Sequence, residues 1–208
     1  TMLMKISACT KNANAAWVAG GGSGCLDSGS SLAASTWYHL FVIGNPTTGT
    51  IDELCSTSAA SPNLPSGYTK KRRIGSFRTN SSSQILAFTQ NEDQFWWKNA
   101  ITDINGGSVS GSSNRSLLPA LSVPTAIQPQ AIINLGITPG SSGLTVVFLS
   151  SFEQNEVSLP GQGDLIANRG DFSGGRFIVR ANSTAQIYAR FSSAVTLYIN
   201  TLGWVDNR

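Results

Sequence analysis

Apolar and polar residues alternate along much of this chain, in short runs separated by glycine, proline and asparagine. Successive side chains of a strand point to opposite faces, so this period of two is typical of half-buried β-strands. The clearest examples are the segments 176–181, 186–191 and 195–199. No stretch of a dozen residues has the apolar spacing of a helix without glycine, proline or β-branched clusters. We therefore expect antiparallel strands with one solvated face, and little or no helix.

The first half of the chain predicts two hairpins. The segments 36–43 and 50–56 are rich in aromatic and β-branched residues and flank a turn that begins at Gly44-Asn45-Pro46. The segments 72–77 and 84–89 are expected to pair across a polar loop. Between the hairpins, Pro62 and Pro65 exclude a central strand, because proline cannot donate to the ladder.

The second half begins after the segment 105–114 (NGGSVSGSSN), whose low complexity predicts a long surface loop. Further strands are expected over 116–123, 126–135, 144–150, 164–168, 176–181, 185–191 and 195–205. Turn signals about 8–12 residues apart, without a fixed repeat, are typical of antiparallel sandwiches. We predict an all-β fold, an antiparallel β-sandwich that is jelly-roll-like, in one domain over 1–208. An alternative division gives 1–104 and 115–208 across the Gly/Ser-rich loop.

The composition changes this picture by indicating a class of protein. The chain has 208 residues, of which 40% are hydrophobic, so it can bury a core. Only 12% are charged, against about 25% in ordinary soluble domains, a habit common in secreted and virion proteins. The net charge is +3, and the one dense basic run, 70–73, is interpreted as an edge strand or loop whose charges discourage pairing. We predict no nucleic-acid partner.

The ends and the apolar runs indicate no membrane segment. No apolar run reaches the roughly 18 residues of a membrane span. The first residues do not resemble a signal peptide. A chain that begins at Thr1 is expected to be a processed protein or a fragment of a longer one.

The candidate chemistry is sparse. Cys9, Cys25 and Cys55 lack metal-ligand spacing, and we expect free thiols with at most one disulfide. His39, the one histidine, lies in an aromatic strand, where a structural role is favoured over catalysis. Asp52 and Glu53 are neighbours on a strand and point to opposite faces, so they cannot flank one glycosidic bond. We predict no enzyme activity, no metal and no cofactor.

Several motifs resemble one family when they are taken in order. They are the segments 35–43 (STWYHLFVI), 48–52 (TGTID), 56–59 (STSA), 64–68 (LPSGY), 72–76 (RRIGS), 88–97 (FTQNEDQFWW) and the closing 201–206 (TLGWVD). Each is weak alone, but the series over about sixty residues is similar to bacteriophage and prophage tail-fibre-associated proteins. The region 106–194 matches only in its β pattern.

The resemblance implies a virion structural protein, a tail-fibre or fibre-tip module that attaches to the host cell. It implies a homo-oligomer, expected to be a trimer, that contacts other virion tail proteins and binds a bacterial surface glycan or outer-membrane receptor. Two alternatives stay open. One is a capsid or head fibre, decoration or tail-assembly protein without receptor binding, and the other is a polysaccharide depolymerase.

Two groups of residues are candidates for ligand binding. Trp96 and Trp97 point to opposite faces of their strand, so at most one is core and the other needs a subunit, a loop or a ligand to cover it. Arginines and an aromatic residue share the polar face of the last strands, and they form either a receptor surface or a subunit interface. This second group consists of Arg176, Arg180, Tyr188 and Arg190.

Overall fold

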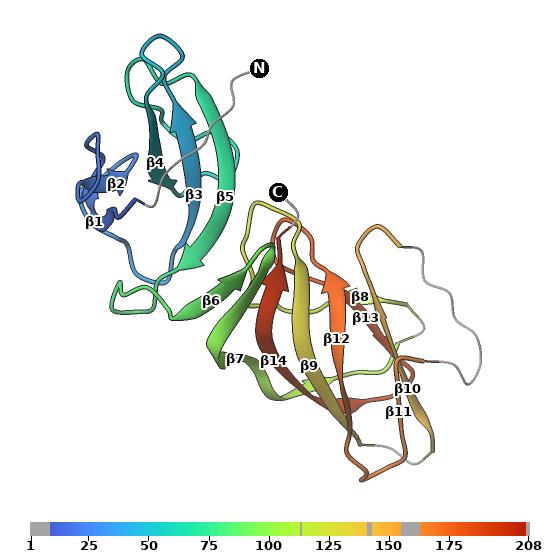
Figure 1. Cartoon of the computed structure of the whole chain (residues 1–208). Helices are drawn as coiled ribbons and strands as arrows, with labels where there is room; N and C mark the ends of the chain where they lie inside the picture. Colours follow the sequence, from blue (N-terminus) through green and yellow to red (C-terminus); the bar gives the residue numbers. More distant parts are fainter. Residues whose placement is uncertain (1–8, 113, 141–142, 155–162, 207–208) are drawn as a thin grey trace. The chain divides into compact units, whose positions relative to one another are not determined.

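The computed structural model describes residues 9–112, 114–140, 143–154 and 163–206, and these residues contain strands and loops but no helix (Figure 1). The expected all-β fold is therefore confirmed, while the sandwich and jelly-roll topology stays a prediction. Accordingly, the described residues include no helix that is long and apolar enough to cross a membrane. The chain divides between Leu86 and Ala87 into an N-terminal unit and a C-terminal unit.

The N-terminal unit is one five-stranded sheet in the order β1-β2-β4-β3-β5. Its strands are β1 (Asn12–Ala16), β2 (Gly24–Leu26), β3 (Trp37–Gly44), β4 (Ile51–Ser56) and β5 (Lys70–Arg78). The predicted hairpin of β3 and β4 is confirmed by an antiparallel ladder that pairs Leu40 with Cys55. β1, β2 and β4 run parallel to one another.

The second predicted hairpin is wrong. β5 pairs along its length with β3. The segment 84–89 meets the end of β5 only around an isolated bridge between Thr79 and Ile85, and its last residues, Phe88 and Thr89, enter a strand of the C-terminal unit. Tyr38 of β3 and Phe77 of β5 stack with ring centroids 5.4 Å apart. Burial of these aromatic residues on β3 fixes the position of β5 more strongly than the short polar turn does.

The basic run opens β5, which forms an edge of this sheet. Lys70, Lys71 and Arg72 are exposed there. Charged side chains on an edge strand oppose pairing with a further chain, as the sequence indicated.

The expectation of free cysteines is wrong for two of them. Cys25 of β2 and Cys55 of β4 form a disulfide, with their Cα atoms 5.1 Å apart, and Cys9 is free. Adjacent parallel strands place these residues, 30 positions apart in sequence, at the separation that a disulfide requires. The spacing in the sequence gives no sign of this, because it does not reveal which strands are neighbours.

The C-terminal unit contains two sheets, in the orders β12-β9-β14-β7-β6 and β11-β10-β13-β8 (Figure 1). The strands of the first sheet are β6 (Phe88–Asn91), β7 (Gln94–Val109), β9 (Gln130–Pro139), β12 (Ser173–Arg180) and β14 (Val195–Val205). Those of the second are β8 (Ser116–Leu117), β10 (Thr145–Ser150), β11 (Leu165–Ala167) and β13 (Tyr188–Phe191).

The prediction of a long loop over 105–114 is wrong for its first half, because β7 continues to Val109. β7 pairs with β14 through several register shifts, and one of them lies between Leu197 and Tyr198. Gly106 has a φ of +74° beside this irregularity. A glycine adopts that conformation without steric cost, so here it bends a strand rather than ending it.

The core of the C-terminal unit follows the predicted alternation. Leu197 and Ile199 of β14 are fully buried, and Tyr198 between them is only partly covered. Aromatic residues fill one end of the core. Phe95 stacks on Trp204 with ring centroids 4.8 Å apart, and the ring centroid of Trp97 lies 5.0 Å from that of Trp204. This apolar row occupies one face of β14, so the other face of the five-stranded sheet is left for polar residues.

Candidate ligand-binding groove

The polar face of the five-stranded sheet carries two rows of side chains across β14, β9 and β12. Directly paired residues of neighbouring strands lie on the same face. One row consists of Tyr198, Gly136 and Gly174, and the next consists of Asn200, Asn134 and Arg176. The rows are two residues apart along each strand, which is about 7 Å.

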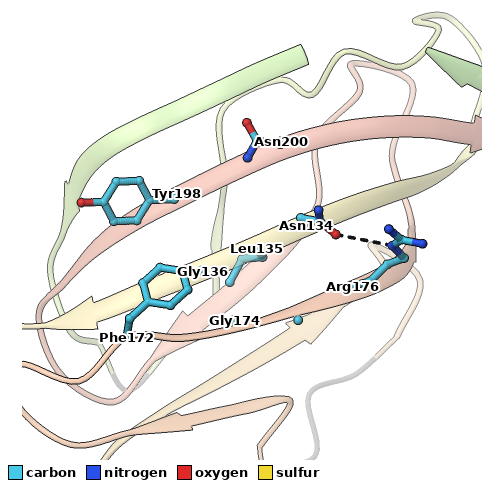
Figure 2. Close-up of a pocket in the computed structure, with 9 residues that line it drawn as sticks. Asn134, Leu135, Gly136, Phe172, Gly174, Arg176, Tyr198 and Asn200 are labelled. Atoms are coloured by element: carbon cyan, nitrogen blue, oxygen red, sulfur yellow. Dashed lines mark hydrogen bonds between the residues drawn. The ribbon is translucent and has the colours of Figure 1, made fainter. Parts of the chain in front are cut away.

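A groove of about 610 Å³ lies over these two rows (Figure 2). Ligand pockets usually measure about 300–1,000 Å³, so the groove is large enough for a small ligand. It is lined by Asn134, Leu135, Gly136, Phe172, Gly174, Gly175, Arg176, Tyr198 and Asn200. The first row supplies aromatic and glycine surface, and the second supplies amide and guanidinium groups.

The Phe172 ring packs against the backbone of two glycines, Gly136 and Gly174. A Cβ on Gly136 would lie 2.5 Å from Phe172 Cζ, and one on Gly174 would lie 3.2 Å from Phe172 Cε1. The ring therefore packs against backbone that only glycine leaves accessible. Phe172 nevertheless remains 69% exposed. An apolar ring held in place and left open to solvent is available to stack on a ligand.

Tyr198 forms the second aromatic wall. Its ring centroid lies 6.3 Å from that of Phe172, at an angle of 59° between the ring planes. A Cβ on Gly106 would lie about 4 Å from the Tyr198 ring and hydroxyl, so Tyr198 extends over the bend of β7. The two rings form a corner with one polar tip, the Tyr198 hydroxyl.

The polar row supplies hydrogen-bond donors. Asn134 Oδ1 accepts a long hydrogen bond of 3.4 Å from Arg176 Nε, marked in Figure 2. Asn200 Oδ1 accepts a hydrogen bond of 2.7 Å from Thr102 Oγ1. In both asparagines the oxygen is engaged by the sheet, so the amide nitrogen is the group left to contact a ligand.

Three of the predicted site residues lie on this face. Arg176 lines the groove. Trp96 is half-buried and pairs with Gly203, in a row that continues to Ile132 and Ile178 beside the groove. Arg180 lies farther along β12.

The other three predicted residues lie elsewhere. Trp97 is only 6% exposed and donates from Nε1 to the Ser122 carbonyl at 3.0 Å, so it belongs to the core. The ring of Tyr188 lies under the guanidinium of Arg115 at 4.2 Å, on β13 of the second sheet. Arg190, also on β13, lies 4.4 Å from the ring centre of Phe148.

The single row proposed from the sequence therefore does not form. β12 pairs with β9 in one sheet, whereas β13 pairs with β10 in the other. The chain crosses between the sheets at a turn in which Asn182 Oδ1 accepts hydrogen bonds from the backbone N–H groups of Thr184 and Gln186. Alternation gives the face of each strand, but it does not give the sheet to which that strand belongs.

The sequence did not single out Phe172, Tyr198, Asn134 or Asn200. The one local signal is an aromatic residue beside two glycines, in the segment 171–175 (DFSGG). A pair of glycines usually indicates a turn, but Gly174 and Gly175 lie within β12. The remaining lining residues come together only through pairing of β14, β9 and β12, which are distant in sequence.

The remaining candidates for chemistry are closed or engaged. His39 Nδ1 lies 2.9 Å from Ser76 Oγ, but the two residues are only 1% and 3% exposed, so a substrate cannot reach them. A second hollow of about 340 Å³, beside Trp17, includes Asp27, whose carboxylate already accepts the Asn63 backbone N–H. Among the described residues, no group of His, Cys, Asp and Glu could hold a metal ion.

A comparison with models of protein families finds no match for this chain, and a comparison with curated proteins finds none.

Proposed function

We propose that the chain is a tail-fibre or fibre-tip module of a bacteriophage and that its C-terminal unit binds carbohydrate on the host cell surface. The phage assignment rests on the ordered motifs of the segments 35–97 and 201–206. The ligand class rests on the groove. The observation that carries it is Phe172, an exposed ring seated on glycine beside a row of amide and guanidinium donors.

A sugar ring suits this combination of groups. A pyranose has an apolar face of C–H groups and a rim of hydroxyls, so it needs an aromatic surface and hydrogen-bond partners within the width of one ring. The aromatic row and the polar row are separated by about 7 Å, which meets that requirement. A purely apolar ligand would leave Asn134, Asn200 and Arg176 desolvated and unpaired, at a cost in affinity.

Adhesion is favoured over hydrolysis by the composition of the groove. Most glycosidases place two carboxyl groups beside the scissile bond, and the lining residues include no Asp or Glu. A shallow site of this kind is expected to bind weakly. If a virion carries several fibres and each ends in a trimer, avidity would raise the total affinity by about 10²–10⁴.

The test compares binding of the purified chain to a panel of bacterial surface polysaccharides. We expect the variant Phe172→Ala to bind about tenfold more weakly, because it removes the stacking surface. Gly136→Ala should have a similar effect without removing any functional group, since its Cβ would displace the Phe172 ring. Ile178→Ala is the matched control, because Ile178 is exposed on β12, the strand that follows Phe172, but does not line the groove.

Thermal unfolding of each variant separates loss of binding from loss of fold. Phe172 and Ile178 are both more than half exposed, so each substitution should change stability by no more than about 0.5 kcal/mol. If Phe172→Ala and Gly136→Ala both bind with the affinity of wild type, the ligand binds outside the groove. A wild-type chain that binds no polysaccharide of a susceptible host would overturn the adhesion proposal and favour the head-fibre or assembly alternative.

A further inference from the structure

We infer that the groove selects acidic sugars and binds their carboxylate group at Arg176. This inference rests on the proposed function, because it names the class of carbohydrate that the same groove accepts. The reasons are the charge of the lining, the contacts of Arg176 and its position relative to the aromatic row.

The groove has one charged side chain, and that side chain is positive. Arg176 lines the groove, and the other lining residues are neutral. Asp171 precedes Phe172 in the chain but is not among the lining residues. A ligand in the groove therefore meets an unbalanced positive charge, which favours an anion over a neutral sugar.

Two arginines of β12 point to the same face but differ in their contacts. Arg180 forms an ion pair with Glu153 at 3.1 Å, and its other terminal nitrogen makes a long contact of 3.4 Å with Gln128. Arg176 has only the 3.4 Å contact with Asn134, which is longer than the usual 2.7–3.2 Å of an N–H···O bond. The described part of the chain places no carboxylate within ion-pair distance of Arg176. Its terminal N–H groups are thus available to a ligand, whereas those of Arg180 are already engaged.

The geometry brings two donors to one position. A guanidinium presents parallel N–H groups that match the two oxygens of a carboxylate. Asn134 pairs directly with Arg176 across β9 and β12, and its oxygen faces the arginine, so its amide nitrogen is a further donor beside the guanidinium. The Phe172 ring covers the adjacent row at Gly136 and Gly174. A sugar stacked on Phe172 would therefore direct a substituent from its rim toward Arg176, about one row away.

The experiment uses matched pairs of glycans. Each member of a panel of bacterial polysaccharides that contain hexuronic acid is compared with the same polymer after reduction of its carboxylates to primary alcohols. Reduction removes the charge and keeps the ring and its linkages. For the wild-type chain we expect at least one acidic polymer to bind about tenfold more tightly than its reduced form at low salt. Added salt should diminish that preference, because the site is open to solvent.

Variants of the two arginines then assign the preference to one residue. Arg176→Gln should bind the acidic and the reduced form of each polymer with equal affinity, because it lacks the charge that distinguishes the two forms. Arg176→Lys should keep part of the preference, because it retains the charge but loses the fork of donors. Arg180→Gln, on the same strand and face, should behave as wild type.

The possible results separate a failure of the acidic-sugar inference from a failure of the proposed carbohydrate binding. If wild type binds both forms of every polymer equally and Phe172→Ala abolishes binding of both, the groove binds carbohydrate but the inference is wrong. If the acidic preference persists in Arg176→Gln, a different residue provides it and the inference is also wrong. If no polymer binds in either form, the proposed function itself fails.

Discussion

The two units differ in what stabilises them. A disulfide and a buried ion pair support the N-terminal unit, whereas long strands with a large apolar core form the C-terminal unit. In the N-terminal unit, the Cys25–Cys55 disulfide connects β2 to β4, and Lys11 forms an ion pair of 2.8 Å with Asp52, both side chains being only 4% exposed. In the C-terminal unit, the long strands β7, β9 and β14 bury aromatic and branched residues, including the fully buried Trp204.

The difference follows from the size of the elements. β1 and β2 have five and three residues and run parallel, so they bury little apolar surface of their own. A small core of this kind usually needs covalent or ionic support. The C-terminal unit buries one face of its five-stranded sheet along the length of β14 and β9. Its opposite face is therefore free to carry glycines, an exposed ring and a groove that contribute little to stability.

The largest expected effect is on the C-terminal core. Trp204→Ala should lower the free energy of unfolding of the C-terminal unit by about 3–5 kcal/mol, because it empties a site that is 0% exposed and packed against Phe95. Hydrogen exchange followed by mass spectrometry in increasing denaturant reports each unit separately. Protection should fall in β7, β9 and β14 and stay unchanged in β3 and β4. Trp96→Ala, on the half-buried face, is the control and should cost less.

The next effect concerns the disulfide. Replacing Cys25 and Cys55 together by Ser should lower the stability of the N-terminal unit by about 3–4 kcal/mol, the chain-entropy value for a loop closed by two cysteines that are 30 positions apart. Protection should fall in β2 and β4 and not in the C-terminal sheets. Cys9→Ser is the control, since Cys9 is free. Equal losses in both units would contradict the division of the chain into two independently stabilised cores.

The smallest effect distinguishes a buried ion pair from an exposed one. Burial raises the pKa of Asp52, but hydrogen bonds from Lys11 and from the backbone N–H groups of Gly20 and Glu53 outweigh it, so the pKa lies below 3.8. A carboxyl with a lowered folded pKa stabilises the protein above its unfolded pKa, and that contribution is lost as the pH falls through the folded pKa. The N-terminal unit should therefore lose stability below pH 3.8, and Asp52→Asn should weaken this dependence.

Two controls accompany that pH series. Burial and the neighbouring Asp52 raise the pKa of Glu53 above 4.5. The stability that the protonated Glu53 contributes is therefore lost as the pH rises, not as it falls. Glu53→Gln should accordingly leave the loss of stability below pH 3.8, the acid limb, in place. Arg180 and Glu153 are 39% and 49% exposed, so Arg180→Gln should change stability by less than about 1 kcal/mol. An acid limb that is identical in wild type and Asp52→Asn would show that the Lys11–Asp52 pair does not stabilise the N-terminal unit.

The elements that were predicted well are those whose information is local. The β3–β4 hairpin is specified by two apolar runs and a Gly-Asn-Pro turn, and the alternation of β14 appears directly as burial of Leu197 and Ile199. The prediction for 105–109 failed because glycine breaks many strands, but here the pairing of β7 with β14 compensates for it. Local composition does not include that long-range contribution.

The sequence by itself determined the all-β class, the faces of most strands and the presence of an arginine-bearing polar face in the last quarter of the chain. It also limited the core to at most one of the two adjacent tryptophans, and the structure buries Trp97 and leaves Trp96 half-buried. Only the tertiary structure decided which strands became neighbours: it joined Cys25 to Cys55, separated Arg176 from Arg190 and placed Phe172 on Gly136. The physical reason is that a period of two fixes a side chain's face, whereas the choice of partner strand depends on burial summed over the whole unit.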